Sequence, residues 1–164
     1  MNKQKFFLGY LTGLLFSLGL VCAFVYFQTK TSDLTIQEFD MKNLNGTKIN
    51  IDDFKGKPIV INVWATWCGP CIAEFPEFEK TQNKFKNVNF FFVTDEPVTK
   101  ALKFLKKRNF NLNFVTSDNN FSKMGIKIRP VTYFFDKKGD LVNKIDGDTF
   151  ETEIITILNT ILEK

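Results

Sequence analysis

The sequence predicts an α/β domain, a central mixed sheet flanked by helices, preceded by one transmembrane helix. Three observations support this prediction. Residues 6–27 form an almost unbroken, uncharged apolar run. A shorter apolar run at residues 59–64 leads directly into a Cys-x-x-Cys pair, and strand-like and helix-like segments alternate after it. The roughly 130 residues from Leu34 onward suit one domain with one core.

The N-terminal apolar run is long enough to cross a membrane, because 1.5 Å per helical residue spans the roughly 30 Å of a hydrocarbon core. Lys3 and Lys5 precede it, while residues 28–33 are nearly neutral. The positive-inside rule therefore places the N-terminus in the cytoplasm and the domain outside the cytoplasmic membrane, in the periplasm if the cell has one. We predict an anchor at 1–28, a linker at 29–33 and a domain at 34–164.

Two alternatives exist for this N-terminal segment. A signal peptide cleaved near residues 21–23 would leave a secreted or periplasmic protein, although residues 24–27 continue the apolar run. A lipoprotein modified at Cys22 is a weaker alternative because Val21 stands where a small residue is usual. Inside a membrane span, Cys22 is simply a small apolar residue.

The elements of the domain follow in order. Residues 34–39 and 47–51 flank the Asn45-Gly46 turn signal and predict an N-terminal β-hairpin. A central strand at 59–64 and a helix reaching about Phe85 come next. The remaining predicted elements are a strand at 88–94, a helix at 97–108, a short strand at 113–116, a helical turn at 121–124, an antiparallel pair at 131–136 and 141–146, and a helix at 151–162.

Cys68 and Cys71 lie where the central strand turns into the helix, and this position predicts a redox site. Unpaired N–H groups at a helix N-terminus stabilise a thiolate, so Cys68 is the expected nucleophile and Cys71 the resolving thiol. Pro70 is tolerated in the first helical turn because its missing N–H breaks no hydrogen bond there. Thiol exchange of this kind needs no cofactor.

A zinc site and a purely structural disulfide are the alternatives for the cysteine pair. A zinc site needs further Cys or His ligands, but the chain has no His and one other cysteine, Cys22. We therefore expect no metal. A purely structural disulfide would close a very short loop and add little stability.

Residues 63–71 and the following Glu74-Phe75-Pro76 resemble the TlpA/ResA-like family of membrane-anchored, thioredoxin-fold thiol-disulfide oxidoreductases. The resemblance extends from about Leu34 onward and implies a thioredoxin fold, for which a strand-helix insertion is typical of this group. Asn62 replaces the buried Asp of thioredoxin itself, which favours this branch. Pro76 matches a helix-kinking proline, and Glu74 matches a glutamate with a role in proton handling. A solvent-exposed surface acid is the alternative for Glu74.

The resemblance also implies a groove that faces the cysteine pair. Pro130 is the candidate cis-proline, and Trp67, Gly69, Pro70 and Arg129 are the accompanying candidates for substrate binding. Arg129 departs from the family, in which a small or β-branched residue usually precedes this proline. Its cation either favours the Cys68 thiolate or points away into solvent.

By this resemblance we predict a reductase of disulfides in exported proteins, with c-type apocytochromes as candidate substrates. Gly69-Pro70 matches thioredoxin, whose potential lies near about −270 mV, against about −120 mV for the oxidant DsbA. Such a reductase would be recharged by a separate transmembrane thiol carrier. An anchored oxidant or isomerase, a non-catalytic peptide-binding module and, more remotely, a copper carrier are the alternatives.

Composition adds little to these predictions. The formal net charge is +4, and the densest basic cluster shares a helical pattern with apolar residues, which indicates a solvated helix face and no nucleic-acid partner. That cluster consists of Lys103, Lys106, Lys107 and Arg108. The 20 Phe residues are interpreted as packing residues.

Overall fold

The computed structural model describes residues 13–22 and 34–163. The chain divides into two units, Met1–Asp33 and Leu34–Lys164. In the first unit, residues 13–22 are helical and exposed. Among the described residues, no helix is both long enough and apolar enough to cross a membrane. Most of the predicted anchor, residues 6–12 and 23–27, and the predicted linker at 29–33 lie outside the described residues.

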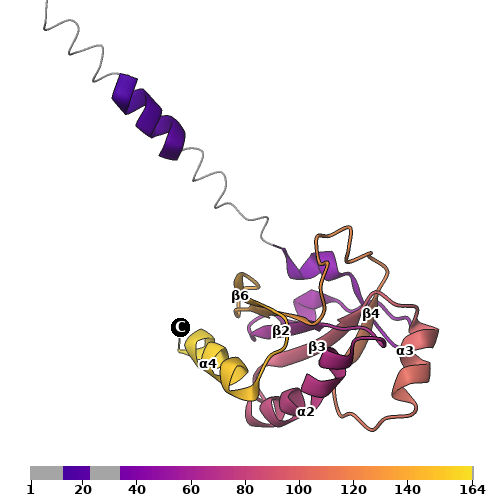
Figure 1. The fold of residues 1–164 in the computed structure, drawn as a ribbon. Coiled ribbons are helices and arrows are strands. Elements are labelled where there is room, and N and C mark those ends of the chain that lie inside the picture. The colour runs from indigo at the N-terminus through magenta and orange to yellow at the C-terminus, as the bar shows by residue number, and fades with distance from the viewer. Residues whose placement is uncertain (1–12, 23–33, 164) are drawn as a thin grey trace, which may run out of the picture. The chain divides into compact units, whose positions relative to one another are not determined.

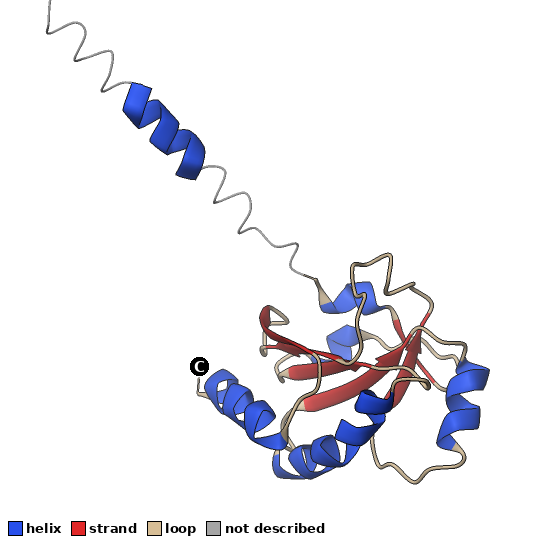
Figure 2. Cartoon of the chain, in the orientation of Figure 1, coloured by secondary structure: helices blue, strands red, loops and turns tan. Residues whose placement is uncertain are grey.

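The second unit is built around a six-stranded mixed sheet with the strand order β1-β4-β3-β2-β5-β6 (Figures 1 and 2). Strands β2, β3 and β4 run parallel to one another, while β1, β5 and β6 each pair antiparallel with their neighbours. The strands are β1 (Met41–Asn43), β2 (Ile59–Val63), β3 (Asn89–Thr94), β4 (Phe114–Ser117), β5 (Val131–Phe135) and β6 (Leu141–Asp146). This arrangement confirms the predicted mixed sheet.

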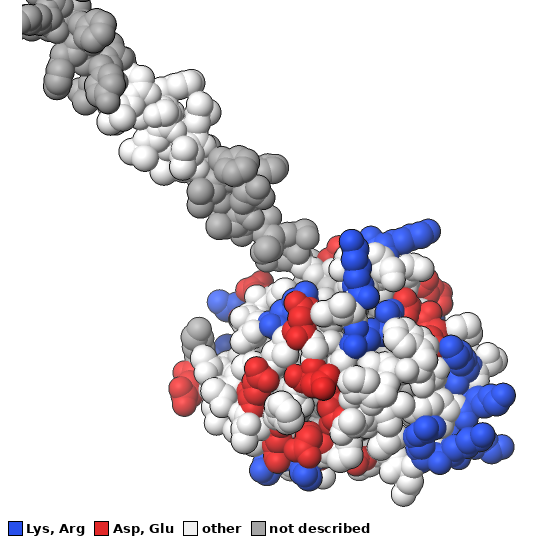
Figure 3. Space-filling view, in the orientation of Figure 1, with Lys and Arg blue, Asp and Glu red and all other residues white. Residues whose placement is uncertain are grey.

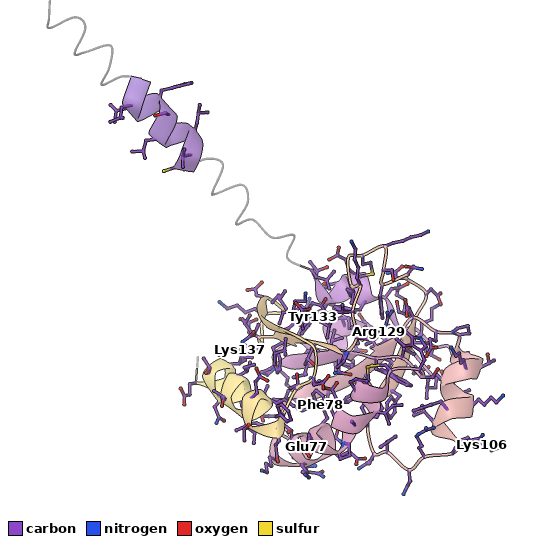
Figure 4. The ribbon with its side chains drawn as sticks, in the orientation of Figure 1. Glu77, Phe78, Lys106, Arg129, Tyr133 and Lys137 are labelled. Atoms are coloured by element: carbon purple, nitrogen blue, oxygen red, sulfur yellow. A yellow bond between two sulfur atoms is a disulfide. The ribbon has the colours of Figure 1, made fainter. Side chains whose placement is uncertain are left out.

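One face of the sheet is covered by the helices α2 (Gly69–Lys84), α3 (Val98–Leu105) and α4 (Glu151–Leu162). Their apolar side chains form one core with β2 and β3, in which Phe78 of α2 and Leu158 of α4 are fully buried. The opposite face carries a second core that contains Tyr133. Figure 4 labels Phe78 and Tyr133 on the two sides of the sheet.

The central strand β2 is buried on both faces, as a continuous apolar run predicts. Its residues alternate, so that Ile59, Ile61 and Val63 enter the second core while Val60 packs under the helices. Asn62 has the same parity as Val60 and therefore points toward α2. An amide side chain is thus buried directly below the helix that carries the cysteines.

The predicted N-terminal hairpin is only partly correct. Residues 36–39 form a 3₁₀-helix, η1 (Ile36–Phe39), and not a strand. Thr35 and Glu38 form a capping box, in which the Thr35 backbone N–H donates to the Glu38 carboxylate at 2.6 Å, and this local bonding competes with an extended chain.

The turn itself is present, with Gly46 at a φ of 88°. The first strand, however, is β1, and its partner across the turn is reduced to a single bridge between Lys42 and Lys48. Residues 51–54 form a second 3₁₀-helix, η2 (Ile51–Phe54), capped by the Asn50 side chain. Strand β1 finds its main partner in β4, a pairing that the sequence did not predict.

The other predicted elements are confirmed to within a few residues. Helix α4 and strand β6 have the predicted bounds, and residues 121–125 form the predicted turn. Helix α3 ends at Leu105, and the basic residues on it and just after it are exposed, as Figure 3 shows at the α3 end of the domain. Leu102, one of the apolar residues that share the helical pattern of this basic cluster, is 45% exposed.

Candidate active site

The two cysteines form a disulfide at the start of α2. Cys68 is the N-cap residue and Cys71 lies in the first turn, with 5.3 Å between their Cα atoms. Both are buried, at 3% and 0% exposure. The Cys71 backbone N–H donates a hydrogen bond to Cys68 Sγ at 3.2 Å. A helix N-terminus therefore supports Cys68, which after reduction favours its thiolate form.

Gly69 and Pro70 occupy the first two positions of α2 and are both exposed. Pro70 disrupts no helical hydrogen bond at this position, as predicted. Further along, Pro76 lies inside the helix. The helix continues through it to Lys84, so the proline is accommodated without ending the helix.

The two tryptophans beside the disulfide have opposite environments. Trp64 is fully buried, and its indole N–H donates to the Phe92 carbonyl at 3.1 Å. Trp67, directly before Cys68, is 66% exposed. A large apolar ring exposed next to a reactive sulfur is available for contact with a bound polypeptide, and the role of Trp67 in substrate binding stays a prediction.

Glu74 lies one helical turn after Cys71 and is 5% exposed, so it is not a surface acid. Its Oε1 accepts a hydrogen bond from Asn62 Nδ2 at 2.7 Å, and its Oε2 accepts one from the Thr149 backbone N–H at 3.0 Å. Asn62 also donates to the Thr132 hydroxyl at 3.0 Å. Residues from three other segments thus hold this carboxyl group in place, Asn62 and Thr149 directly and Thr132 through Asn62.

Burial raises the pKa of Glu74 from 4.5 to about 7, although the hydrogen bonds from Asn62 and Thr149 lower it and oppose this effect. No cation pairs with the Glu74 carboxylate among the described residues. A carboxyl group with a pKa near 7 accepts and releases protons readily at neutral pH, which is what a general acid or base requires.

The loop before β5 carries Pro130, and the Arg129–Pro130 peptide bond is cis, as predicted. The Pro130 carbonyl accepts a hydrogen bond from the Gly147 backbone N–H at 2.9 Å, which ties this loop to the segment before α4. Strand β5 begins at the next residue and pairs with β2, the strand that leads into the disulfide. The proline loop and the cysteine loop therefore lie at the same end of the sheet.

The solvent-exposed alternative for Arg129 is wrong. The side chain is 7% exposed, so it does not extend into solvent. Its Nη2 pairs with Asp95 Oδ1 at 2.7 Å, so its charge is balanced and is not a free cation beside Cys68.

Asp95 and Glu96, which follow β3, were missed by the sequence analysis. Glu96 is 9% exposed and accepts hydrogen bonds from the Thr66 backbone N–H at 2.6 Å and from the Thr66 hydroxyl at 3.1 Å. It also pairs with Lys100. The only available signal was the position of two acids after a parallel strand, because the carboxyl ends of such strands line the functional edge of an α/β sheet.

The site is therefore a dithiol–disulfide centre with a buried proton-accepting group. Two electrons and the associated protons can be exchanged with another disulfide here without a cofactor. Within residues 13–22 and 34–163, no group of three side chains is arranged to hold a metal ion.

Comparisons with known proteins agree with this chemistry. The model of the AhpC/TSA family matches residues 34–144. The thiol-disulfide oxidoreductase ResA of Bacillus subtilis strain 168 is 28% identical over 174 residues, covering 98% of this chain and 95% of that protein.

Two solved structures have a similar fold. A candidate thiol-disulfide oxidoreductase from Bacteroides vulgatus is 32% identical, with a TM-score of 0.66 over 75% of this chain and 91% of that one. The exposed lipoprotein thioredoxin Etrx1 of Streptococcus pneumoniae is 21% identical, with a TM-score of 0.67 over 74% of this chain and 98% of its own. At this identity the second likeness shows the thioredoxin fold alone.

Proposed function

We propose that this chain, which belongs to the AhpC/TSA family and is a ResA-like thiol-disulfide oxidoreductase of the thioredoxin fold, reduces the disulfides of exported proteins. The observation that carries the proposal is the placement of Glu74, with a pKa of about 7, one turn beyond a cysteine pair at a helix N-terminus. This arrangement supplies both a stabilised thiolate and a proton acceptor at neutral pH.

The exchange takes two steps. The Cys68 thiolate attacks one sulfur of the substrate disulfide, a mixed disulfide forms, and the other substrate sulfur leaves as a thiolate. Cys71 then loses its proton to the Glu74 carboxylate and attacks Cys68 Sγ, which releases the second substrate thiolate. Two electrons have moved from the protein to the substrate, and Cys68 and Cys71 are left as the disulfide seen in the structure.

The direction of exchange is part of the proposal. The Gly69-Pro70 dipeptide between the cysteines supports a reductase, because thioredoxin has the same pair and a potential near about −270 mV. Candidate substrates are c-type apocytochromes, whose cysteines must be reduced before haem attachment. An oxidising compartment would return the enzyme to the disulfide form, so a separate transmembrane thiol carrier would resupply electrons.

The location is likewise proposed from the N-terminal sequence. The uncharged run at residues 6–27, preceded by Lys3 and Lys5, supports a single-pass anchor with the catalytic domain outside the cytoplasmic membrane. A membrane-impermeant thiol reagent applied to intact cells tests this location. Cys22 should not react, whereas the cysteine introduced by Thr31→Cys should react.

The reduction potential of the Cys68–Cys71 pair tests the direction. The full-length chain is equilibrated with a defined thiol–disulfide buffer, and the reduced fraction is counted by alkylation. A potential below about −230 mV supports a reductant, whereas a potential above about −150 mV identifies an oxidant and contradicts the proposal.

A further inference from the structure

The carboxylate of Asp95 joins two ends of the loop that leads to Pro130. Its Oδ2 accepts the Phe121 backbone N–H at 3.1 Å, and its Oδ1 accepts Arg129 Nη2 at 2.7 Å. The side chains of Asp95 and Arg129 are 17% and 7% exposed. Asp95 lies directly after β3, so a strand end holds the position of the arginine. Figure 4 labels Arg129.

The guanidinium of Arg129 lies between two aromatic rings at the edge of the disulfide site. Its Cζ is 5.7 Å from the ring centre of Trp67 and 6.0 Å from that of Phe121. Trp67 is mostly exposed and adjoins Cys68, so Arg129 lies just behind the surface that a substrate would meet. A mostly buried cation without a partner would be costly, and Asp95 removes that cost.

Large apolar side chains are exposed on the loops around the disulfide. Three loops meet around the disulfide, and each exposes one large apolar side chain, namely Trp67, Ile128 and Phe150, at 66%, 53% and 69% exposure. The hydrogen bond between Gly147 and Pro130 and the one between Thr149 and Glu74 bring the third loop to the site. Exposed apolar groups from three different loops indicate a contact surface for an apolar partner.

Glu96, which directly follows Asp95, adds no unpaired carboxylate. Glu96 pairs with Lys100, as Asp95 pairs with Arg129, so both carboxylates at the end of β3 are paired. A polypeptide that docks against Trp67 and Ile128 therefore meets apolar side chains and a paired arginine, while the exposed charges of Lys127 and Asp148 lie on the two flanking loops.

We propose that Asp95 is a specificity-determining residue, which masks the charge of Arg129 so that the site selects disulfides flanked by apolar side chains over those flanked by acidic ones. This rests on the proposed exchange with polypeptide disulfides and adds the class of substrate. Asp95 does not touch the reacting sulfurs and acts through Arg129.

The test compares two fluorescent peptide disulfides that differ only in the residues on either side of each cysteine, two leucines or two aspartates. Second-order rate constants are measured with the reduced full-length chain at low and high salt. The wild type should react faster with the leucine probe. Asp95→Asn should shift the ratio of rates toward the aspartate probe by at least about fivefold at low salt, because one unmasked cation then attracts it.

Two further variants check the assignment to Arg129. Arg129→Gln leaves the Asp95 carboxylate without its partner and should shift the ratio away from the aspartate probe. The double variant Asp95→Asn/Arg129→Gln should restore the wild-type ratio, because neither charge is present. Asp118→Asn, which removes an exposed carboxylate paired with Lys42, is the matched control and should leave the ratio unchanged.

Equal losses with both probes would mean that Asp95 only supports the fold, and an unchanged ratio in both single variants would equally overturn the proposal. If Asp95→Asn does not fold, Arg129→Gln alone decides by the direction of its shift. A failure of the proposed reductase direction is distinguishable, because the oxidised chain can be tested with the reduced forms of the same probes. In that reverse reaction the oxidised chain must also react faster with the leucine probe than with the aspartate probe.

Discussion

Glu74 and Glu96 are two mostly buried glutamates near the same disulfide, yet the pKa of Glu74 is raised and that of Glu96 is lowered. Each accepts a backbone N–H and a neutral side-chain hydrogen bond, Glu74 from Thr149 and Asn62, and Glu96 from the N–H and hydroxyl of Thr66. Glu96 accepts a further hydrogen bond from Lys100. Burial raises the pKa of Glu74 to about 7. Burial also acts on Glu96, but its bonds to Lys100 and Thr66 outweigh it and lower the pKa.

The two glutamates differ in their charged neighbours, and Asp148 further raises the pKa of Glu74. Lys100, one turn further along the chain, pairs with Glu96, whereas the Asn62 amide that faces Glu74 carries no charge. A buried carboxyl group thus becomes a proton carrier near pH 7 only where no positive charge compensates its burial. Glu96 instead remains charged and holds the loop before Cys68 through Thr66.

The largest effect on the rate of disulfide exchange is expected from substitution of the cysteines, the reacting groups beside which both glutamates lie. Cys68→Ser should lower the rate of disulfide exchange at least about 1,000-fold, because the remaining thiol, Cys71, is fully buried and cannot reach a substrate disulfide. Cys71→Ser should instead accumulate a mixed disulfide with the substrate, visible on a non-reducing gel. Exchange that persists in Cys68→Ser would show that the catalytic centre is elsewhere.

Stability should depend on pH through Glu74. Its folded-state pKa lies above its unfolded value, so the folded protein binds a proton that the unfolded chain has lost, and stability falls as the pH rises from 4.5 to 7. At 1.36 kcal/mol per pKa unit the loss amounts to at most about 3 kcal/mol. Urea unfolding of the wild type and of Glu74→Gln at pH 4.5 and 7.5 measures it.

The Glu74→Gln variant should lack this contribution to the pH dependence. Glu77→Gln is the control, because Glu77 is a surface residue paired with Lys80 on the same helix. A wild type and a Glu74→Gln variant with the same pH dependence would contradict the raised pKa.

Glu74→Gln should also slow the exchange at pH 7 about 100-fold, a typical contribution of one general acid or base, while it keeps an amide in place of the carboxyl group. The wild-type rate should change slope near pH 7, and this inflection should be absent in the variant. Stopped-flow kinetics over pH 5 to 9 give both quantities. Glu96→Gln, if it still folds, should retain the inflection, since a charged Glu96 does not titrate in this range.

The smallest effect is expected from the cation that separates the two glutamates. Lys100→Met should raise the pKa of Glu96, as measured by NMR titration of its side-chain carbon. The accompanying loss of stability should stay below about 1 kcal/mol, because Lys100 is 52% exposed. Lys103 is an exposed lysine on the same helix, so Lys103→Met is the control and should leave the pKa of Glu96 unchanged. If the pKa of Glu96 is unchanged in Lys100→Met, the hydrogen bonds from Thr66 and not the lysine cause its low value.

Elements with a strong periodic pattern were predicted well from the sequence. The continuous apolar run of β2, the Gly139 turn signal between β5 and β6 and the apolar spacing of α4 are local signals that need no partner. The N-terminal hairpin was predicted from an Asn-Gly turn alone. There, the capping box of Thr35 and Glu38 formed a 3₁₀-helix where a strand was expected, and β1 took a partner some 70 residues away in β4.

The features of the candidate site likewise fall into those predicted from nearby residues and those set by residues distant in the sequence. The cysteine pair and its helix N-terminus follow from a short motif, because residues a few positions apart have nearly fixed geometry, and the cis-proline was predicted from the family resemblance. The acidity of Glu74 depends on Asn62 and Thr149, and the charge of Arg129 on Asp95, 34 residues earlier in the chain. Burial and ion pairing are properties of the folded surroundings, so the sequence determined which groups are present, and only the tertiary structure decided which of them carry a proton and which carry an unmasked charge.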